Sequence, residues 1–296
     1  MGYQLWTSPI TGYRRRGTRL SELRSLIDAG ITIHAILEPL QSCSADADAL
    51  EMARLLADRD FDVAGVQERK DGPVIGFVKK ERLVAGLVRD HVEPLFVEHI
   101  ISDGTPLPAA FSVLSAKPRV FVLIGAKVKG IATRTDLNKP PVRIYLFGLV
   151  SLLEMHLTFW VRAEYPDDTW QAQISSVRVE AAKKVQEDRR AVGQICDLID
   201  CIQISDKRDL LLKRKDLCRE LGFGSKRQAE RFLKKAEGLR NLLAHGQQNL
   251  VEGSSWEELF ALVAWLETIV RTSDELVEQR AAAAAQQGVV TLWSSA

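Results

Sequence analysis

A repeated order of elements in the first half of the chain limits its fold more than any other feature. Residues 46–66 and 104–124 each read as a helix followed by an extended apolar segment, then a turn and a second extended segment. The copies align at an offset of 57, which pairs Leu50 with Leu107, Ala53 with Ala110 and Val63 with Val120. The repeat predicts two small α/β units that pack their sheets together.

The second extended segment of each copy carries a glycine. Gly76 lies in "DGPVIGFV" and Gly130 in "GAKVKGIAT", at an offset of 54. We therefore expect the second hairpin to be three residues shorter than the first.

The repeat resembles a pair of cystathionine-beta-synthase (CBS) domains, because its second copy ends in "GIATRTD", Gly130 to Asp136. The family's nucleotide-binding pattern is glycine, apolar, any residue, Ser/Thr, any residue, Ser/Thr, Asp. The resemblance implies that the Thr133 hydroxyl meets phosphate and that Asp136 holds ribose hydroxyls, with Gly130 and Thr135 completing the motif. It also implies an adenine-type nucleotide as a regulatory ligand.

The chemistry of this motif is compatible with a second interpretation. A carboxylate can accept two hydrogen bonds from a ribose diol, but "TRTDL" before an apolar segment is also ordinary helix capping. The first copy departs from the pattern, since "GFVKKER" has no hydroxyl and places Arg82 where the aspartate belongs. We expect one nucleotide site per chain at most.

The second half of the chain reads as long helices. The prolines of "DLNKPPV" mark the boundary. We expect helices at 142–163, 168–192, 194–204, 206–221, 225–247 and 254–280. The predicted fold is α+β: an N-terminal segment (1–30), a tandem CBS-like α/β pair (31–139), an all-α bundle (141–280) and a tail (281–296).

The composition narrows the class of protein. Forty basic and 39 acidic residues give a net charge of +1, so any signal for a polyanion must be local. Cys43, Cys196, Cys201 and Cys218 form no Cys-x-x-Cys pair, and the five histidines have no metal-ligand spacing, so no metal site is expected. The N-terminus lacks the apolar run of a signal peptide, which favours the cytoplasm.

The apolar segment 144–161 is nearly long enough to span a membrane. Glu154 and His156 lie near its middle, where ionisable groups are costly. We therefore interpret it as a buried helix of a bundle and expect no membrane partner. Glu154 is interpreted as a structural partner for an arginine, although a second functional group is the alternative.

The helix expected at 225–247 separates two kinds of side chain. Phe232, Ala236, Leu239 and Leu243 recur at helical spacing and form its core face. Four other side chains fall within an arc of about 140° on the opposite side: Glu237, Arg240, Asn241 and His245. They can form an ordinary solvated face or a site that handles phosphate.

Local charge favours the second interpretation. Residues 205–235 contain eleven Lys/Arg and five Asp/Glu, a surplus of +6. A basic surplus beside Arg240 and His245 is what a polyanion site requires.

The segment "EGLRNLLAH" resembles the HEPN (higher eukaryote and prokaryote nucleotide-binding) domain, an all-α bundle. Its ribonuclease members carry Arg, a polar residue, three further residues and His on a late helix, matched here by Arg240, Asn241 and His245. The resemblance implies a homodimer in which two motifs meet, and RNA cleavage without metal. The predicted function is a nucleotide-regulated endoribonuclease of toxin-like or antiviral, phage-defence type.

The side chains suit this chemistry. Histidine, with an ordinary pKa of about 6.5, can move protons near neutral pH, and arginine can stabilise a phosphorane. Two histidines from two chains would serve as base and acid when the RNA 2′-hydroxyl attacks phosphate and leaves a 2′,3′-cyclic phosphate. Asn241 can orient phosphate or ribose. Glu237 can hold the Arg240 guanidinium, or form a plain ion pair.

Two rival functions stay open from the sequence. One is a non-catalytic, nucleotide-responsive binding or dimerisation module. The other is a toxin held inactive by an antitoxin protein or a modifying transferase, with the CBS-like pair as a scaffold.

Overall fold

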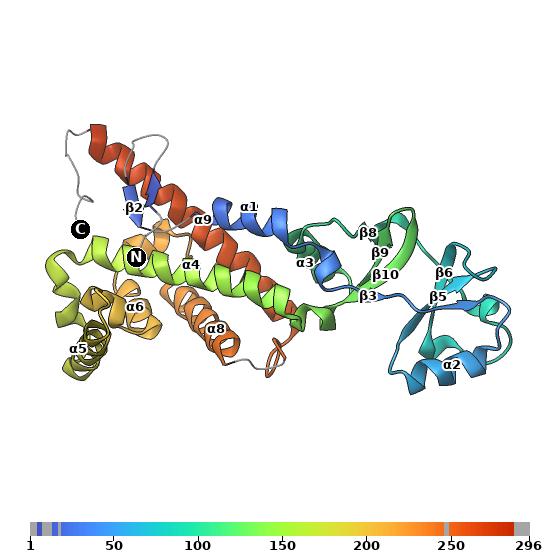
Figure 1. The fold of residues 1–296 in the computed structure, drawn as a ribbon. Coiled ribbons are helices and arrows are strands. Elements are labelled where there is room, and N and C mark those ends of the chain that lie inside the picture. The colour runs from blue at the N-terminus through green and yellow to red at the C-terminus, as the bar shows by residue number, and fades with distance from the viewer. Residues whose placement is uncertain (1–4, 8–13, 17–18, 246–248, 287–296) are drawn as a thin grey trace. The chain divides into compact units, whose positions relative to one another are not determined.

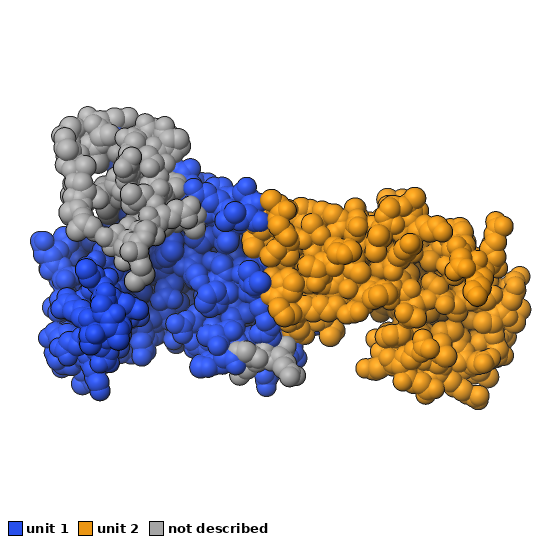
Figure 2. Space-filling view, viewed as in Figure 1, with its two compact units in different colours: residues 1–26, 143–296 blue, residues 27–142 orange. Residues whose placement is uncertain are grey.

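A computed structural model describes residues 5–7, 14–16, 19–245 and 249–286. The chain divides into two units, one formed by residues 27–142 and the other by residues 1–26 together with 143–296 (Figure 2). The first unit is mixed α/β and the second is largely helical. Of the tail predicted at 281–296, residues 287–296 lie outside the described part, and α9 (Trp256–Gln286) continues into its first residues.

The α/β unit contains the predicted repeat (Figure 1). The first copy consists of β4 (Ser42–Ser44), α2 (Ala49–Asp58), β5 (Val63–Gln67) and β6 (Val74–Lys79). The second consists of β8 (Ile100–Ser102), α3 (Leu107–Ala116), β9 (Arg119–Ile124) and β10 (Lys127–Thr133). In each copy the first two strands are parallel and the last two form an antiparallel hairpin.

The two copies exchange their edge strands. β3 (Glu38–Pro39) precedes the first copy but pairs with β10 of the second, giving the sheet order β3-β10-β9-β8. β7 (Glu93–Pro94) lies between the copies and pairs with β6, giving β4-β5-β6-β7. Proline lacks a backbone N–H, so these two-residue strands are suited to a sheet edge. The short edges limit the open backbone that each sheet presents.

The glycine equivalence predicted from the sequence is confirmed by strand register. Gly76 lies opposite Pro94 in one sheet, and Gly130 lies opposite Pro39 in the other. A Cβ on Gly76 would come within 2.6 Å of the Glu93 carbonyl oxygen. Glycine is required there because the edge strand approaches the backbone closely.

The predicted alignment of the helices is wrong by one residue. α2 and α3 align at an offset of 58, which matches the fully buried Ala49 and Leu56 with Leu107 and Leu114, whereas Leu50 is 46% exposed. The loop from helix to strand has four residues in the first copy and two in the second. The hairpin is two residues shorter in the second copy, not three.

The apolar faces of the copies form two clusters. One lies between α2 and its own sheet and includes Met52, Leu56 and Val66. The other joins the two sheets around Val63, Phe77 and Phe121, and the rings of Phe77 and Phe121 lie 5.0 Å apart. The two sheets therefore pack together, as the sequence predicts.

The helical unit contains the longest elements of the chain. Its helices are α1 (Leu20–Gly30, whose last residues lie in the α/β unit), α4 (Pro140–Glu164), α5 (Ser176–Ala191), α6 (Ile204–Leu211), α7 (Lys215–Glu220), α8 (Lys226–Ala244) and α9. A short hairpin of β1 (Leu5–Thr7) and β2 (Arg14–Arg16) precedes them. The unit has several more breaks than the sequence predicts.

Two predicted helices are interrupted. The helix expected at 168–192 is a 3-10 segment (Pro166–Gln173) followed by α5, because Asp167 and Asp168 adopt positive φ angles of 53° and 56°. The helix expected at 206–221 splits into α6 and α7. Leu210, Leu211 and Leu212 are all buried, and three consecutive side chains cannot lie on one helix face. The residues predicted as helix at 194–204 contain the 3-10 turn Leu198–Cys201.

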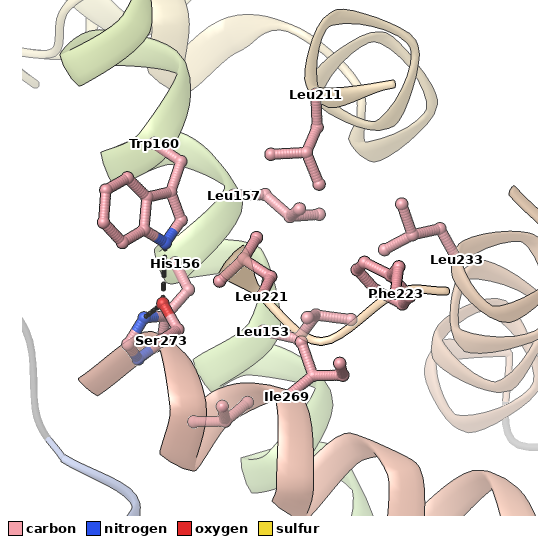
Figure 3. Close-up of a pocket in the computed structure, with 11 residues that line it drawn as sticks. Leu153, His156, Leu157, Trp160, Leu211, Leu221, Phe223, Leu233, Ile269 and Ser273 are labelled. Atoms are coloured by element: carbon pink, nitrogen blue, oxygen red, sulfur yellow. Dashed lines mark hydrogen bonds between the residues drawn. The ribbon is translucent and has the colours of Figure 1, made fainter. Parts of the chain in front are cut away.

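Helix α4 forms the centre of the helical core. Among the described residues it is the one helix long and apolar enough to cross a membrane, and 56% of its most apolar window is buried within the protein. Leu153 and Leu157 contact the same small cavity as Leu221 and Ile269 (Figure 3). This cavity of about 10 Å³ is at the lower limit for one water molecule. The side chains around it therefore form a close-packed hydrophobic core.

Candidate functional site

Helix α8 begins as the sequence predicts. Gly222 has a φ of +90°, and the Ser225 side chain caps the helix by accepting a hydrogen bond of 3.1 Å from the Gln228 N–H. The Gln228 side-chain oxygen accepts another from the Gly224 N–H. Of the predicted core face, Phe232, Ala236 and Leu239 are buried, whereas Leu243 is only half-buried.

The motif residues lie at the C-terminal end of α8. Asn241 and His245 are exposed, and Arg240 is half-buried. The Arg240 Nη1 donates to the Asn241 Oδ1 at 3.3 Å. His245 caps the helix through its backbone N–H, which donates to the Asn241 carbonyl at 3.0 Å. Within the described part of the chain, no hydrogen bond or ion pair involves the His245 ring; residues 246–248 lie outside it.

Glu237 does not hold the Arg240 guanidinium. Its Oε2 lies 2.5 Å from Nη1 of Arg208, which comes from α6. Arg208 also contacts Asp209, so Glu237 is one member of an ion-pair cluster between α6 and α8. The predicted role of Glu237 beside Arg240 is therefore wrong, because a long-range partner occupies its carboxylate.

Ion pairs in the folded chain neutralise part of the local charge surplus predicted from the sequence. Several cations of residues 205–235 pair with acids from elsewhere in the chain: Lys207 with Glu154, Arg208 with Glu237, Arg214 with Glu164 and Lys235 with Glu258. The bases of this segment with no ion pair among the described residues are Lys213, Lys215, Lys226, Arg227 and Arg231, of which Lys213 donates to Gln173 and the last three lie on α8. The open positive charge is thus concentrated on the helix that carries His245.

Glu154 and His156 have structural partners. Glu154 pairs with Lys207 at 3.2 Å, so its partner is a lysine and not the expected arginine. The Trp160 Nε1 donates to the Ser273 Oγ, which lies 2.6 Å from the Nδ1 of His156 (Figure 3). The Nε2 of His156 lies 3.5 Å from Asp274. These contacts join α4 to α9 inside the core.

The motif at the end of the second copy, Gly130 to Asp136, folds as a capping box. The Asp136 Oδ2 accepts hydrogen bonds from the Thr133 N–H at 2.8 Å and from its hydroxyl at 2.9 Å. The Asp136 Oδ1 lies 2.8 Å from the amine of Lys139. Asp136 is only 9% exposed, whereas Thr135 is exposed. The capping interpretation is confirmed, and ribose binding stays a prediction.

Lys139 links this motif to the exchanged edge strand. Its amine contacts Asp136, Glu38 of β3 and the Ile36 carbonyl. Burial opposes the charge of the amine, but its bonds to Asp136 and Glu38 outweigh burial and raise the pKa of Lys139. The motif is therefore held in place by the strand that completes its sheet.

The corresponding place in the first copy carries positive charge where the second copy has a carboxylate. Strand register puts Lys79 in the position of Thr133 and Arg82 in that of Asp136, as the sequence predicts. Glu93 of β7 accepts both cations, at 2.9 Å from Lys79 and 3.5 Å from Arg82. A carboxylate for a ribose diol is absent from this position.

Two further features are not evident from the sequence motifs. A groove of about 360 Å³ runs between α8 and α9. The sulfur atoms of Cys196 and Cys201 lie 3.6 Å apart. The described residues contain no group of three or more His, Cys, Asp or Glu that could hold a metal. Only the packing of α9 on α8 creates the groove, so helical periodicity gives no direct signal for it.

No protein-family model and no curated protein matches this sequence. Among solved structures, the chain is similar to the CBS-pair protein CBSX2 from Arabidopsis thaliana, at 19% identity over 39% of this chain and 96% of that chain, with a TM-score of 0.34. It is also similar to the CBS domain pair of MJ0100, solved with 5′-methylthioadenosine and S-adenosyl-L-methionine, at 14% identity over 36% of this chain and 96% of that chain, with a TM-score of 0.32.

A third similar structure is an uncharacterized conserved protein from Pyrococcus horikoshii, at 19% identity over 36% of this chain and 88% of that chain, with a TM-score of 0.32. CBSX2 has also been solved in complex with AMP.

Proposed function

We propose that this protein is an endoribonuclease whose cleavage site includes Arg240, Asn241 and His245. The observation that carries the proposal is the 3.3 Å hydrogen bond from Arg240 to Asn241. Asn241 lies one helical turn before His245, so it shares the face of that residue. The bond therefore draws the guanidinium toward the exposed side of α8 where His245 lies.

The arrangement provides the groups that RNA cleavage needs. The His245 imidazole can take the proton of the RNA 2′-hydroxyl as that oxygen attacks the adjacent phosphorus. The guanidinium of Arg240 can stabilise the negative charge of the phosphorane. The bond from phosphorus to the 5′-oxygen then breaks, and that oxygen takes a proton from a second imidazole. The products are a 2′,3′-cyclic phosphate and a 5′-hydroxyl.

The second imidazole belongs to a second copy of the chain in this proposal. Exposure of apolar side chains on one face of α4 supports self-association, since Ile144 is 60%, Phe147 49% and Met155 39% exposed. These residues recur within about 80° of arc around the helix. Sedimentation of the wild type and of Phe147→Glu tests the dimer. A wild-type monomer would contradict it.

The α/β unit is the proposed regulator. Its two sheets with exchanged edge strands form a tandem pair, and the motif from Gly130 to Asp136 lies at the end of β10 in one of them. Thr135 is exposed, and the neighbouring Asp136 is held by Lys139. An adenine nucleotide would place its ribose and phosphate at these residues. Such a ligand changes cleavage only if it binds active and inactive dimers unequally.

The deciding experiment incubates the full-length protein with RNA in EDTA, with and without adenine nucleotides, and determines the end groups of the fragments. We expect cleavage that leaves 2′,3′-cyclic phosphates, and no cleavage of DNA, which lacks the attacking hydroxyl. A requirement for Mg²⁺ with 3′-hydroxyl products would refute this mechanism.

A further inference from the structure

The groove between α8 and α9 has an aromatic floor. Trp265 of α9 is half-buried and lies against Phe223, with ring centroids 6.2 Å apart and planes inclined by 26°. Phe232 of α8 contacts the same indole at 5.7 Å. Both phenyl rings are buried, so they hold the indole from the core side. The exposed part of Trp265 lines the groove.

The α8 side of the groove carries hydrogen-bond donors and positive charge, whereas the α9 side includes the carboxylates of Glu257 and Glu258. Arg231 is exposed and has no hydrogen bond or ion pair among the described residues. Gln228 also lines the groove, and its side-chain oxygen accepts from the Gly224 N–H, so its amide nitrogen is the group left to donate. Lys235 is tied to Glu258 of α9 at 2.9 Å, so it bridges the two helices. An open guanidinium beside a flat aromatic surface suits a ligand with both an aromatic ring and an anion.

The groove and His245 lie along the same side of α8. Fourteen residues separate Arg231 from His245, which is about 21 Å along the helix and within about 40° around it. Gly238 lies between them, and its Cβ position is open space. An extended polynucleotide strand can therefore follow this exposed face from the groove to the motif.

We propose that the groove binds one unpaired base of single-stranded RNA, stacked on Trp265 with an adjacent phosphate on Arg231. The volume of about 360 Å³ accommodates a base and part of its sugar. A duplex keeps its bases paired and stacked, so it cannot fill this site. The role in substrate selection rests on the cleavage proposed above, whereas binding itself can be measured without cleavage.

The test measures the affinity of the full-length protein for a labelled oligodeoxyadenylate, which lacks the 2′-hydroxyl, and for an abasic oligomer with the same phosphates. We expect the intact oligomer to bind about 5- to 150-fold more tightly. Trp265→Leu should remove most of this difference. Trp256→Leu is the matched control, since Trp256 is also half-buried on α9 but does not line the groove, and it should keep the difference.

A second variant guards against misfolding at Trp265. Arg231→Glu changes an exposed side chain, and it should weaken the binding of both oligomers, as the loss of a phosphate contact does. Equal affinities of the wild type for intact and abasic oligomers would overturn the site, as would tighter binding of duplex. Base-dependent binding without RNA cleavage would uphold the groove and remove the nuclease. Cleavage that depends on His245, with no preference for the intact oligomer, would uphold the nuclease and remove the groove.

Discussion

His245 follows the last residue of α8 and lies off the core face, so it can be replaced with little effect on the fold. We expect His245→Ala and Arg240→Ala each to abolish RNA cleavage in EDTA. Asn241→Ala should lower the rate by only about 10-fold, because it removes one hydrogen bond to the guanidinium and no proton carrier. Single-turnover cleavage and circular dichroism check these outcomes. Wild-type rates in His245→Ala would end the assignment.

Glu237 provides a contrasting case on the same helix. Glu237→Gln should lower the free energy of unfolding by about 1–3 kcal/mol, because it leaves the largely buried Arg208 with one fewer anionic partner. The cleavage rate of the folded variant should not change. Urea unfolding, followed by rate measurements at matched folded fractions, tests this. A loss of cleavage at unchanged stability would restore a catalytic role for Glu237.

The motif from Arg240 to His245 could be found in the sequence because its residues are neighbours on one helix. The partners of Glu237 and Glu154 could not, since Arg208 and Lys207 reach them from α6. Sequence spacing reports contacts within a helix, whereas these ion pairs depend on how helices pack. For the same reason, the charge surplus counted along residues 205–235 is larger than the unpaired positive charge of that segment in the folded chain.

At the scale of elements, the 3-10 turn Leu198–Cys201 brings the sulfur of Cys201 to 3.6 Å from that of Cys196. Burial, and then the hydrogen bond between the two sulfurs, raise the pKa of Cys201 to about 11. The neutral thiol is thus favoured in the folded state, and this contribution to stability is lost as pH rises through that value.

We therefore expect Cys201 to resist alkylation near pH 8, where its thiolate fraction is about 100-fold below that of an ordinary thiol. Its reactivity should rise steadily up to about pH 11. Mass spectrometry after iodoacetamide treatment over a pH series measures this, with the urea-unfolded chain as control. Equal rates for Cys201 in the folded and unfolded chains at pH 8 would contradict the expectation.

The order of helices and strands in the repeat was predictable because each copy combines apolar periodicity with a turn. The exact alignment was not. The first copy has two extra residues before β5 and two more in its hairpin, and loops tolerate such insertions at little energetic cost. Leu50, matched with a core leucine by sequence, is consequently exposed. The break between α6 and α7 has no proline or glycine at the site, and at Asp167 the neighbouring Pro166 lies just outside the helix predicted at 168–192.

At the scale of the whole molecule, the nucleotide hypothesis makes a measurable claim. Asp136→Ala should weaken adenine nucleotide binding about 10- to 150-fold and remove the effect of the nucleotide on cleavage. It should also destabilise the α/β unit, because Asp136 caps the turn after β10 and pairs with Lys139. Calorimetry below the melting temperature of the variant separates the two effects.

Arg82→Ala is the control for that experiment, because Arg82 occupies the corresponding position in the first copy and contacts Glu93. Nucleotide affinity in this variant should equal that of the wild type. Equal affinities in wild type and Asp136→Ala would refute the site. Tight binding that leaves cleavage unchanged would keep the site and remove its regulatory role.

The exchanged edge strands also set an order for synthesis on the ribosome. β7 can join its sheet as soon as residue 94 emerges, since its partner β6 has already been made. β3 must wait for β10, about 90 residues further along the chain. At typical translation rates, the stretch from residue 94 to Thr133 takes roughly 2–8 s. During that interval the nascent chain carries an unpaired β3 and a Phe77 side chain whose partner Phe121 is not yet in place. Chaperone binding should therefore peak in nascent chains that are stalled after residue 94 has emerged and before Thr133 has emerged.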